Sequence, residues 1–278
     1  MSNHIAAEPV PIRAERSTGA RRPDHAAEAV QRGHDMMPPF PRRLLAEFLG
    51  TGLLLVMVVG SGTMAQELSP GNTGLQLLEN STATALGLGV LIMVLGPLSG
   101  AHFNPVVTLA DWWVARRMSA GQIGGYVTAQ VTGGISGAAL ANLMFAKPVI
   151  FWSSHDRAAP HLLLGEVVAT AGLILVIFCL VRAERLSVAP VVVAAYIGAA
   201  SWFTSSACFA NPAVTIARAF SDTFAGIAPS SVPGFVVAQL FGGAVGLALI
   251  GGLYGRTAAS HLDAADISCA HGGAVDSR

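Results

Sequence analysis

The sequence predicts an all-α membrane protein with six transmembrane helices and two re-entrant half-helices, arranged as an inverted repeat. Three observations lead to this fold class. The chain is strongly apolar, its apolar residues form segments long enough to cross a bilayer, and short motifs of the first half recur in the same order in the second half. Together they place most of the chain in a membrane and give both halves one architecture.

Composition makes lipid the main surrounding of the chain. Hydrophobic residues make up 53% of the 278 positions and charged residues 12%, with a mean hydropathy of +0.58. A soluble globular domain carries about a quarter charged residues, so this chain has too few to face water on every side. Sixteen Lys and Arg balance sixteen Asp and Glu, which gives no electrostatic case for a nucleic-acid partner.

The remaining composition argues against metal or redox chemistry. Cys179, Cys208 and Cys269 follow no CxxC or Cys/His spacing, so we expect no metal site, no disulfide framework and no cofactor. Residues 1–41 lack the apolar core of a signal peptide and are predicted to be a disordered cytosolic tail. Residues 257–278 are predicted to be a second cytosolic tail.

Six apolar segments approach the length of about 20 residues that a transmembrane helix needs. In chain order they are residues 44–65, 82–98, 121–146, 162–181, 188–204 and 232–254. Two more apolar pieces, 103–115 and 210–220, are too short to cross and carry Asn-Pro near their starts. We expect them to be half-helices.

Basic residues predict the orientation, because cytoplasmic loops collect Lys and Arg. They flank every second boundary between spans: Arg42, Arg43, Arg116, Arg117, Arg182, Arg185 and Arg256. The opposite loop 66–81 carries two glutamates and no basic residue, and the other two outer loops carry Lys147, Arg157 and Arg218. We therefore expect both termini in the cytoplasm and the protein in the inner (plasma) membrane.

Three pairs of motifs reveal an internal repeat. They are Gly125–Gly137 with Gly234–Gly246, Asn104–Thr108 with Asn211–Thr215, and Glu47-x-x-x-Thr51 with Glu166-x-x-x-Thr170. Each half has three spans, so the second half must be inverted in the membrane. Inverted repeats place a solute site near the midplane, where they meet. The expected channel domain spans 42–256, with a first repeat at about 42–147 and a second at about 160–256.

The two Asn-Pro pairs mark helix starts, since Asn is a favoured N-cap and Pro a favoured first helical residue. Two capped surface helices would look the same in sequence. However, each helix is short and apolar and sits at the equivalent place of an inverted repeat. Broken helices at membrane depth occur where they line a cavity, which favours the re-entrant interpretation.

The runs Ser99–Thr108 and Phe209–Thr215 resemble the paired asparagine-proline-alanine motifs of the aquaporin (major intrinsic protein) family, and the similarity extends over about 42–254. The resemblance implies a homotetramer with one pore per subunit. It places the pore centre at Asn104, Pro105, Val106, Asn211, Pro212 and Ala213, with Val106 where alanine is usual. At that centre, two helix N-termini with partial positive charge and two asparagine amides would donate hydrogen bonds to neutral solutes and repel cations.

The resemblance also assigns the outer constriction. It places Cys208 and Ala199 there, together with Leu86 by helix matching or Thr84 by counting back from Asn104. Val214 stands where an arginine is usual, and Arg218, one turn later, cannot be assumed to replace it. This small, apolar set resembles that of bacterial aquaglyceroporin-like channels associated with arsenic resistance. It implies passage of glycerol-like polyols, arsenous acid, methylated arsenicals and water, with a water-selective pore as the alternative.

Each polar residue within or beside the predicted spans allows a structural or a functional interpretation. A membrane-embedded acid is costly, so Glu47 and Glu166 could form a proton relay. The resemblance favours pairing with backbone N–H groups of the half-helix loops. His102 is expected to hydrogen-bond at the pore floor rather than to bind metal, and Gln130 and Gln239 are expected to support the site.

Three other function classes are weaker. An intramembrane enzyme would need a Ser/His pair, facing aspartates or a zinc helix, and the spans contain none of these. A secondary transporter would need a coupling-ion site near the Asn-Pro junction. An ion channel of the same fold is the third alternative. It gains weight because position 214 lacks the arginine that would repel cations.

Overall fold

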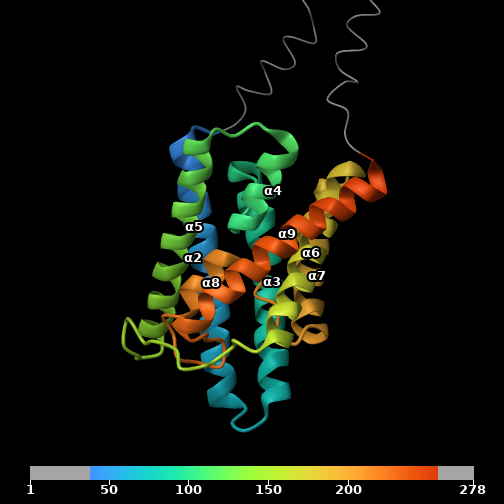
Figure 1. Cartoon of the computed structure of the whole chain (residues 1–278). Helices are drawn as coiled ribbons and strands as arrows, with labels where there is room; N and C mark the ends of the chain where they lie inside the picture. The colour runs from blue at the N-terminus through green and yellow to red at the C-terminus, as the bar shows by residue number, and fades with distance from the viewer. Residues whose placement is uncertain (1–37, 256–278) are drawn as a thin grey trace, which may run out of the picture. The chain divides into compact units, whose positions relative to one another are not determined.

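The structure is a computed structural model that describes residues 38–255, and these residues form helices and connecting loops without any β-strand (Figure 1). The predicted tails therefore lie almost entirely outside the described residues. In chain order the helices are α2 (Phe40–Leu68), α3 (Thr73–Ser99), α4 (Pro105–Ala115), α5 (Ala120–Met144), α6 (Pro160–Arg182), α7 (Ala189–Phe203), α8 (Pro212–Arg218) and α9 (Val232–Tyr254). Short 3-10 turns, η1 (Leu186–Val188) and η2 (Pro229–Ser231), precede α7 and α9.

The element order is the predicted one, with α4 and α8 as the two short helices. Within the described chain, five helical stretches are long and apolar enough to cross a membrane: α2, α3, α6, α7 with η1, and α9 with η2. The sequence predicted six. The remaining one, α5, is 25 residues long but rich in Gly, Ser and Thr. Exposed Thr132 and Ser136 donate their hydroxyl protons to the carbonyls of Thr128 and Thr132 in their own helix, so α5 needs no water to satisfy them.

Helix α3 begins at Thr73, nine residues before the predicted start of the second span at 82. Its first turns contain polar residues, which hide the span from a hydropathy argument. These residues donate hydrogen bonds to backbone carbonyls of α2 and of the residue that follows it. Asn80 donates to the carbonyl of Val58 at 2.8 Å, and Gln76 donates to the carbonyl of Ser69 at 2.8 Å. Asn72 caps the helix by accepting from the Leu75 N–H.

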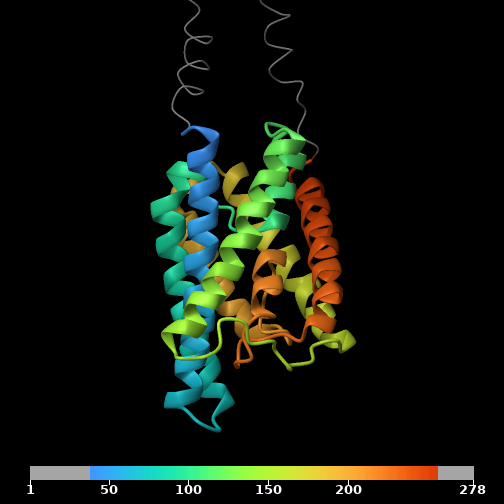
Figure 2. The ribbon, with the colours of Figure 1, turned by 90° about the vertical axis from the view of Figure 1, so that its left-hand side faces the viewer.

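The two halves run in opposite directions. Helix α2 descends from the end of the bundle at which α9 finishes, whereas α6 rises towards that end (Figure 1). Helix α4 lies towards that same end of the bundle and α8 towards the opposite end, as the two views together show (Figures 1 and 2). Helices α2 and α5 pack together in the first half, and α6 and α9 in the second.

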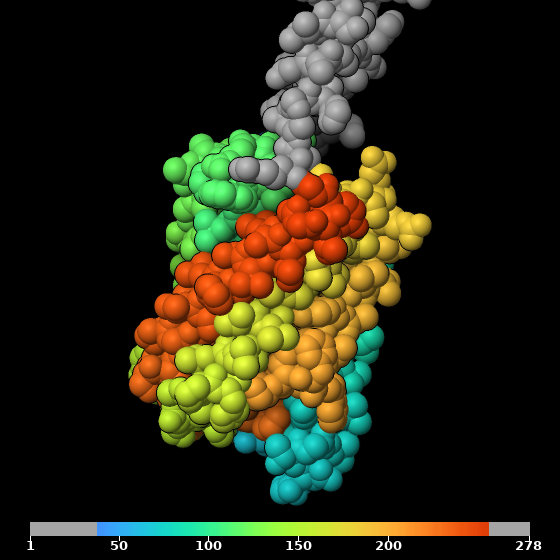
Figure 3. Space-filling model, turned by 45° about the vertical axis from the view of Figure 1, so that its right-hand side comes forward, coloured from blue at the N-terminus to red at the C-terminus, as the bar shows by residue number. Residues whose placement is uncertain are grey.

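Glycines bring these paired helices into contact. A Cβ on Gly137 would overlap the carbonyl of Gly52 in α2, and one on Gly133 would overlap that of Phe48. In the second half a Cβ on Gly242 would lie 2.6 Å from the carbonyl oxygen of Val167 in α6. The repeated Gly-x-x-x-Gly motifs therefore serve as close packing surfaces, as small residues do in membranes. In Figure 3, α9 and α6 lie side by side on one face.

Candidate pore centre and outer mouth

Two asparagines cap the half-helices and tie them to each other. The Asn104 Oδ1 accepts from the Val106 N–H at 2.9 Å, and the Asn211 Oδ1 accepts from the Ala213 N–H at 2.9 Å. Across the junction, the Asn104 amide donates to the carbonyl of Ala210 at 2.8 Å, and the Asn211 amide donates to the carbonyl of Phe103 at 2.7 Å. Each repeat thus holds the helix start of the other.

This reciprocal arrangement leaves donor capacity at the junction. An asparagine amide has two N–H hydrogens, and each of these two amides uses one of them on the opposite repeat. The second hydrogen of each is available to an oxygen of a solute. Pro105 and Pro212 occupy the first helical positions, where a missing N–H costs nothing. The junction can therefore bind hydroxyl oxygens with neutral donors.

The chain enters both half-helices through left-handed backbone that the sequence did not predict. Phe103 has φ +48° and Ala210 has φ +48°, an uncommon conformation for residues other than glycine. These are the residues whose carbonyls accept from the two asparagine amides. The strained turn therefore aims those carbonyls across the junction. Their matching places in the repeat are the only signal of this feature in the sequence.

Glu47 in α2 holds the loop that leads into α4. One carboxylate oxygen accepts from the Ser99 hydroxyl at 2.6 Å and the His102 N–H at 3.0 Å. The other accepts from the Phe103 N–H at 2.7 Å and the Gln130 amide at 2.8 Å. Both oxygens of this carboxylate are therefore occupied as hydrogen-bond acceptors. This geometry supports the structural interpretation of Glu47 over a proton relay.

The second repeat repeats the arrangement with Glu166 in α6. Its oxygens accept from the N–H groups of Phe209 and Ala210 at 2.9 and 2.8 Å, and from the Gln239 amide at 2.6 Å. Gln239 also donates to Thr215 in α8, just as Gln130 donates to Thr108 in α4. His102 contacts Thr108 through Nδ1 at 3.1 Å. It belongs to no cluster of three potential metal ligands among the described residues.

The residues assigned to the constriction separate into two groups. Cys208 and Val214 are buried together with Val106 and Ala200 in one apolar cluster. On α3, Thr84 lies on the same helix face as buried Leu88 and Leu91, because residues three, four and seven apart share a face. Thr84 Oγ1 is buried and has no hydrogen-bond partner among the described residues.

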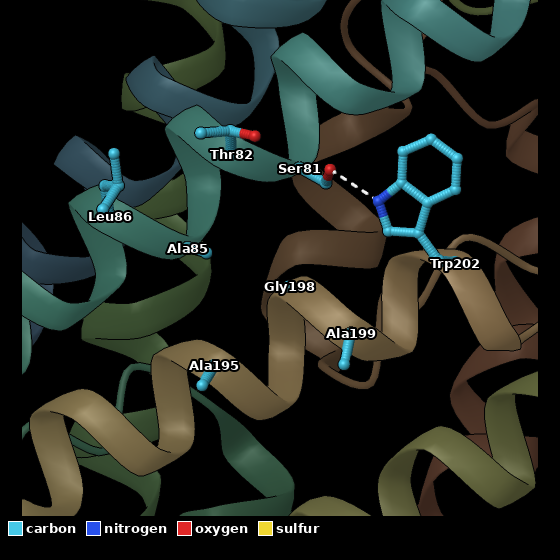
Figure 4. Close-up of a pocket in the computed structure, with 8 residues that line it drawn as sticks. All are labelled: Ser81, Thr82, Ala85, Leu86, Ala195, Gly198, Ala199 and Trp202. Atoms are coloured by element: carbon cyan, nitrogen blue, oxygen red, sulfur yellow. Dashed lines mark hydrogen bonds between the residues drawn. The ribbon is translucent and has the colours of Figure 1, made fainter.

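Leu86 and Ala199 are placed differently from Cys208 and Val214. Leu86 is 69% exposed, and both residues line a shallow groove of about 380 Å³ between α3 and α7. Figure 4 shows this groove, whose rim is closed by a hydrogen bond of 3.1 Å from Trp202 to Ser81. Their helix faces point away from the cluster that holds Cys208. Of the two residues on α3 that the sequence left open, Thr84 has the buried side-chain oxygen, and on α7 the buried residue is Ala200, the neighbour of Ala199.

Comparisons with known proteins agree with this geometry. Residues 36–209 match the model of the Major intrinsic protein family. Aquaglyceroporin AqpS of Rhizobium meliloti (strain 1021) is 49% identical over 209 residues, which cover 75% of this chain and 88% of the relative. The chain belongs to the major intrinsic protein family.

Further similarities are shorter or more distant. Aquaporin-2 of Rattus norvegicus is 42% identical over 101 residues, covering 36% of this chain and 35% of that protein. The X-ray structure of the aquaglyceroporin from Plasmodium falciparum superposes with a TM-score of 0.56 at 21% identity, covering 81% of this chain and all of that chain. It supports the fold alone, and the predicted fold class is confirmed.

Family membership settles the class of function. This major intrinsic protein is a multi-pass membrane channel for small neutral solutes and not an enzyme. The transporter and enzyme alternatives are thereby set aside. Val214, at the position where the resemblance expects an arginine, is apolar and buried.

Two arginines lie against the segment 206–209, and sequence reasoning did not bring them together. Arg157, in the loop between α5 and α6, donates from Nε to the carbonyl of Gly226 at 2.9 Å. Arg218 ends α8 and donates to the carbonyl of Ala225. Burial lowers the pKa of the Arg157 guanidinium from its ordinary value, and the charge of Glu166 opposes that shift. The group stays charged at neutral pH because arginine titrates so high.

Proposed function

We propose that this channel is an aquaglyceroporin with a wide, apolar outer mouth that passes glycerol-like polyols, arsenous acid, methylated arsenicals and water. The observation that carries the proposal is that Val214 is buried and apolar and belongs to the same apolar cluster as Cys208 and Ala200. These side chains are small and neutral, so the mouth can admit a solute as broad as a polyol. An apolar wall also suits the methyl group of a methylated arsenical.

At the pore centre, the proposed ligands of the solute are the free N–H hydrogens of Asn104 and Asn211. The roles of Pro105, Val106, Pro212 and Ala213 follow from their places at the two helix starts. The N-terminus of each half-helix adds a partial positive charge. Arsenous acid is uncharged near pH 7 and carries three hydroxyls, so the junction can treat it as a compact polyol.

The assembly that we propose is a homotetramer in the inner (plasma) membrane with both termini cytoplasmic and a channel domain at 42–256. Arginines at every second span boundary support that orientation. In α3 and α7, 17% and 22% of the most apolar window is buried within one chain, less than in the other membrane-spanning candidates. Small residues line the groove between them. Small residues allow close helix packing in membranes, so this face is the proposed subunit contact.

Solute flux into proteoliposomes tests the proposal. Vesicles that contain the channel should swell faster than empty vesicles in glycerol and urea gradients, and should take up arsenous acid and methylarsonous acid. Val214→Arg should lower uptake of glycerol and both arsenicals, because it narrows the mouth, while water flux persists. Water flux without glycerol flux would favour the water-selective alternative. Glycerol flux without arsenical uptake would leave a channel for polyols alone.

A further inference from the structure

Two positive charges converge on one aromatic ring at the outer mouth. The guanidinium carbon of Arg218 lies 3.4 Å from the ring centroid of Phe209, and that of Arg157 lies 5.1 Å from it. Phe209 directly follows Cys208 in the chain. Arg157 also donates to the carbonyl of Ser206 at 3.4 Å. Both charges are thus anchored to the segment that forms the mouth.

Carboxylates do not neutralise these charges by direct contact in the part of the chain that the structure describes. The side-chain donors of Arg157 reach the carbonyls of Gly226, Ser206 and Phe224, and Arg218 reaches the carbonyl of Ala225. Glu166, whose charge acts on both guanidinium groups, has its oxygens on the N–H groups of Phe209 and Ala210 and on Gln239. Neither guanidinium group therefore has a carboxylate as a direct partner among the described residues.

Helix geometry places one of these charges on the face of α8 that begins at the junction of the half-helices. Asn211, Val214 and Arg218 are three and then four residues apart, so they share one face of α8. Asn211 lies at the junction of the half-helices, and Arg218 lies at the outer end of the same face. A solute that reaches the junction along this face passes Arg218 first and Val214 second.

We propose that Arg157 and Arg218 form an electrostatic barrier that rejects cations and protons at the outer mouth, while the apolar wall at Val214 stays open to neutral solutes. The inference rests on the proposed function, since it requires solutes to pass beside α8. Arg218 is buried, and buried charges are screened by salt far less than exposed ones. Neutral solutes carry no net charge for this field to repel. The two arginines therefore set the selectivity for charge, and the wall at Val214 sets the size of solute that can pass.

A purely structural role makes a different prediction. In that case the two arginines only fasten the loop 219–226 and residue 206 through carbonyl contacts, and geometry matters rather than charge. Lysine keeps the charge and loses the fork-shaped set of donors. Glutamine loses the charge and keeps an N–H donor. The two substitutions therefore separate the electrostatic role from the structural role.

The experiment uses the full chain in proteoliposomes that contain the pH-sensitive dye pyranine, with valinomycin and potassium to hold the membrane potential. Proton influx and glycerol swelling are measured for the wild type, Arg218→Gln, Arg218→Lys, Arg157→Gln and Arg157→Lys. Arg116→Gln is the matched control, since that arginine also lies 4.6 Å from aromatic ring centroids but follows α4. We expect the two Gln variants to raise proton influx about tenfold and to keep glycerol flux within about twofold. The Lys variants and the control should match the wild type.

Two results would overturn the inference. One is unchanged proton influx in both Gln variants that still pass glycerol, and the other is equal leakage in the Lys and Gln variants. If the Gln variants do not fold, the wild type alone tests the inference. Wild-type vesicles that pass glycerol and also show proton influx far above that of empty vesicles would mean that no barrier exists. A wild type that passes no glycerol would instead refute the proposed function.

Discussion

At the scale of single residues, the pore centre depends on side chains that satisfy the ends of interrupted helices. Asn104 and Asn211 accept from the first turns of their own helices and donate to the opposite repeat. Glu47 and Glu166 accept from the loops that lead into those helices. In lipid these backbone groups would otherwise stay unpaired at a high cost. Polar residues in the spans are therefore part of the scaffold.

Replacing Glu47 with glutamine should destabilise the channel. The substitution turns one acceptor oxygen into a donor that faces the N–H and O–H donors of His102 and Ser99, or of Phe103 and Gln130, and leaves them without a partner. The expected cost is about 2 kcal/mol or more, seen as a lower midpoint of thermal unfolding in detergent. Glu67→Gln, on the exposed end of the same helix, should leave the midpoint unchanged. Equal midpoints for both variants would contradict the role of Glu47.

The placement of Thr84 and Leu86 predicts opposite effects of one bulky substitution. Thr84→Trp puts a large ring on the inward face of α3 and should reduce glycerol flux to about a tenth or less. Leu86→Trp puts the same ring on the exposed face and should leave flux near the wild-type value. Stopped-flow swelling of proteoliposomes measures both. The opposite result would restore Leu86 to the constriction.

Helix phase explains why the sequence alone did not decide between these two residues. The half-helix starts could be predicted, because Asn-Pro is a local signal with one structural meaning in an inverted repeat. The constriction could not, since Thr84 and Leu86 depend on how α3 continues through the stretch Gly96-Pro97-Leu98 to Asn104. The structure keeps this stretch within α3, with Pro97 inside the helix and Gly100 as its left-handed cap. Ala199 and Ala200 differ in the same way, by the phase of α7.

At the scale of helices, glycines decide which pairs pack together. A Cβ at Gly137 would overlap the backbone of α2, and the repeat places Gly246 against α6, where a Cβ would lie 2.7 Å from the carbonyl oxygen of Ala171. The glycines of α5 also lower the mean hydropathy of that helix. A composition that weakens the prediction of α5 as a span thus strengthens its packing.

Alanine substitutions along α5 should therefore have opposite effects. Gly137→Ala forces α2 and α5 apart and should lower stability by about 1–3 kcal/mol, the usual cost of overpacking. Gly124→Ala, in the same helix but with no atom within 4 Å of the added Cβ, should be neutral or stabilising by up to about 1 kcal/mol. Thermal unfolding in detergent compares the two. If Gly137→Ala were as stable as Gly124→Ala, the close packing of α2 and α5 would not be needed.

At the scale of the whole molecule, the inverted repeat places equivalent groups from two halves at one junction. Neither half can cap its own half-helix completely, because each asparagine amide donates to a carbonyl of the other half. The membrane-facing surface is less evenly shared. Large exposed side chains of α3, such as Val90 and Met93, and of α7, such as Val191, leave that side of one chain uncovered by its own fold.

This uncovered side predicts how subunits associate. The groove between α3 and α7 is lined by Ala85, Ala195, Gly198 and Ala199, which let a neighbouring helix approach closely. Filling it with Ala199→Phe should disrupt the tetramer. Val237→Phe adds a ring of the same kind on the exposed face of α9 and should not. Light scattering in mild detergent should give four times the 28.5 kDa chain mass for the wild type and Val237→Phe, and a smaller assembly for Ala199→Phe. A tetramer that persists in Ala199→Phe would move the subunit contact away from this groove, and a monomeric wild type would remove it altogether.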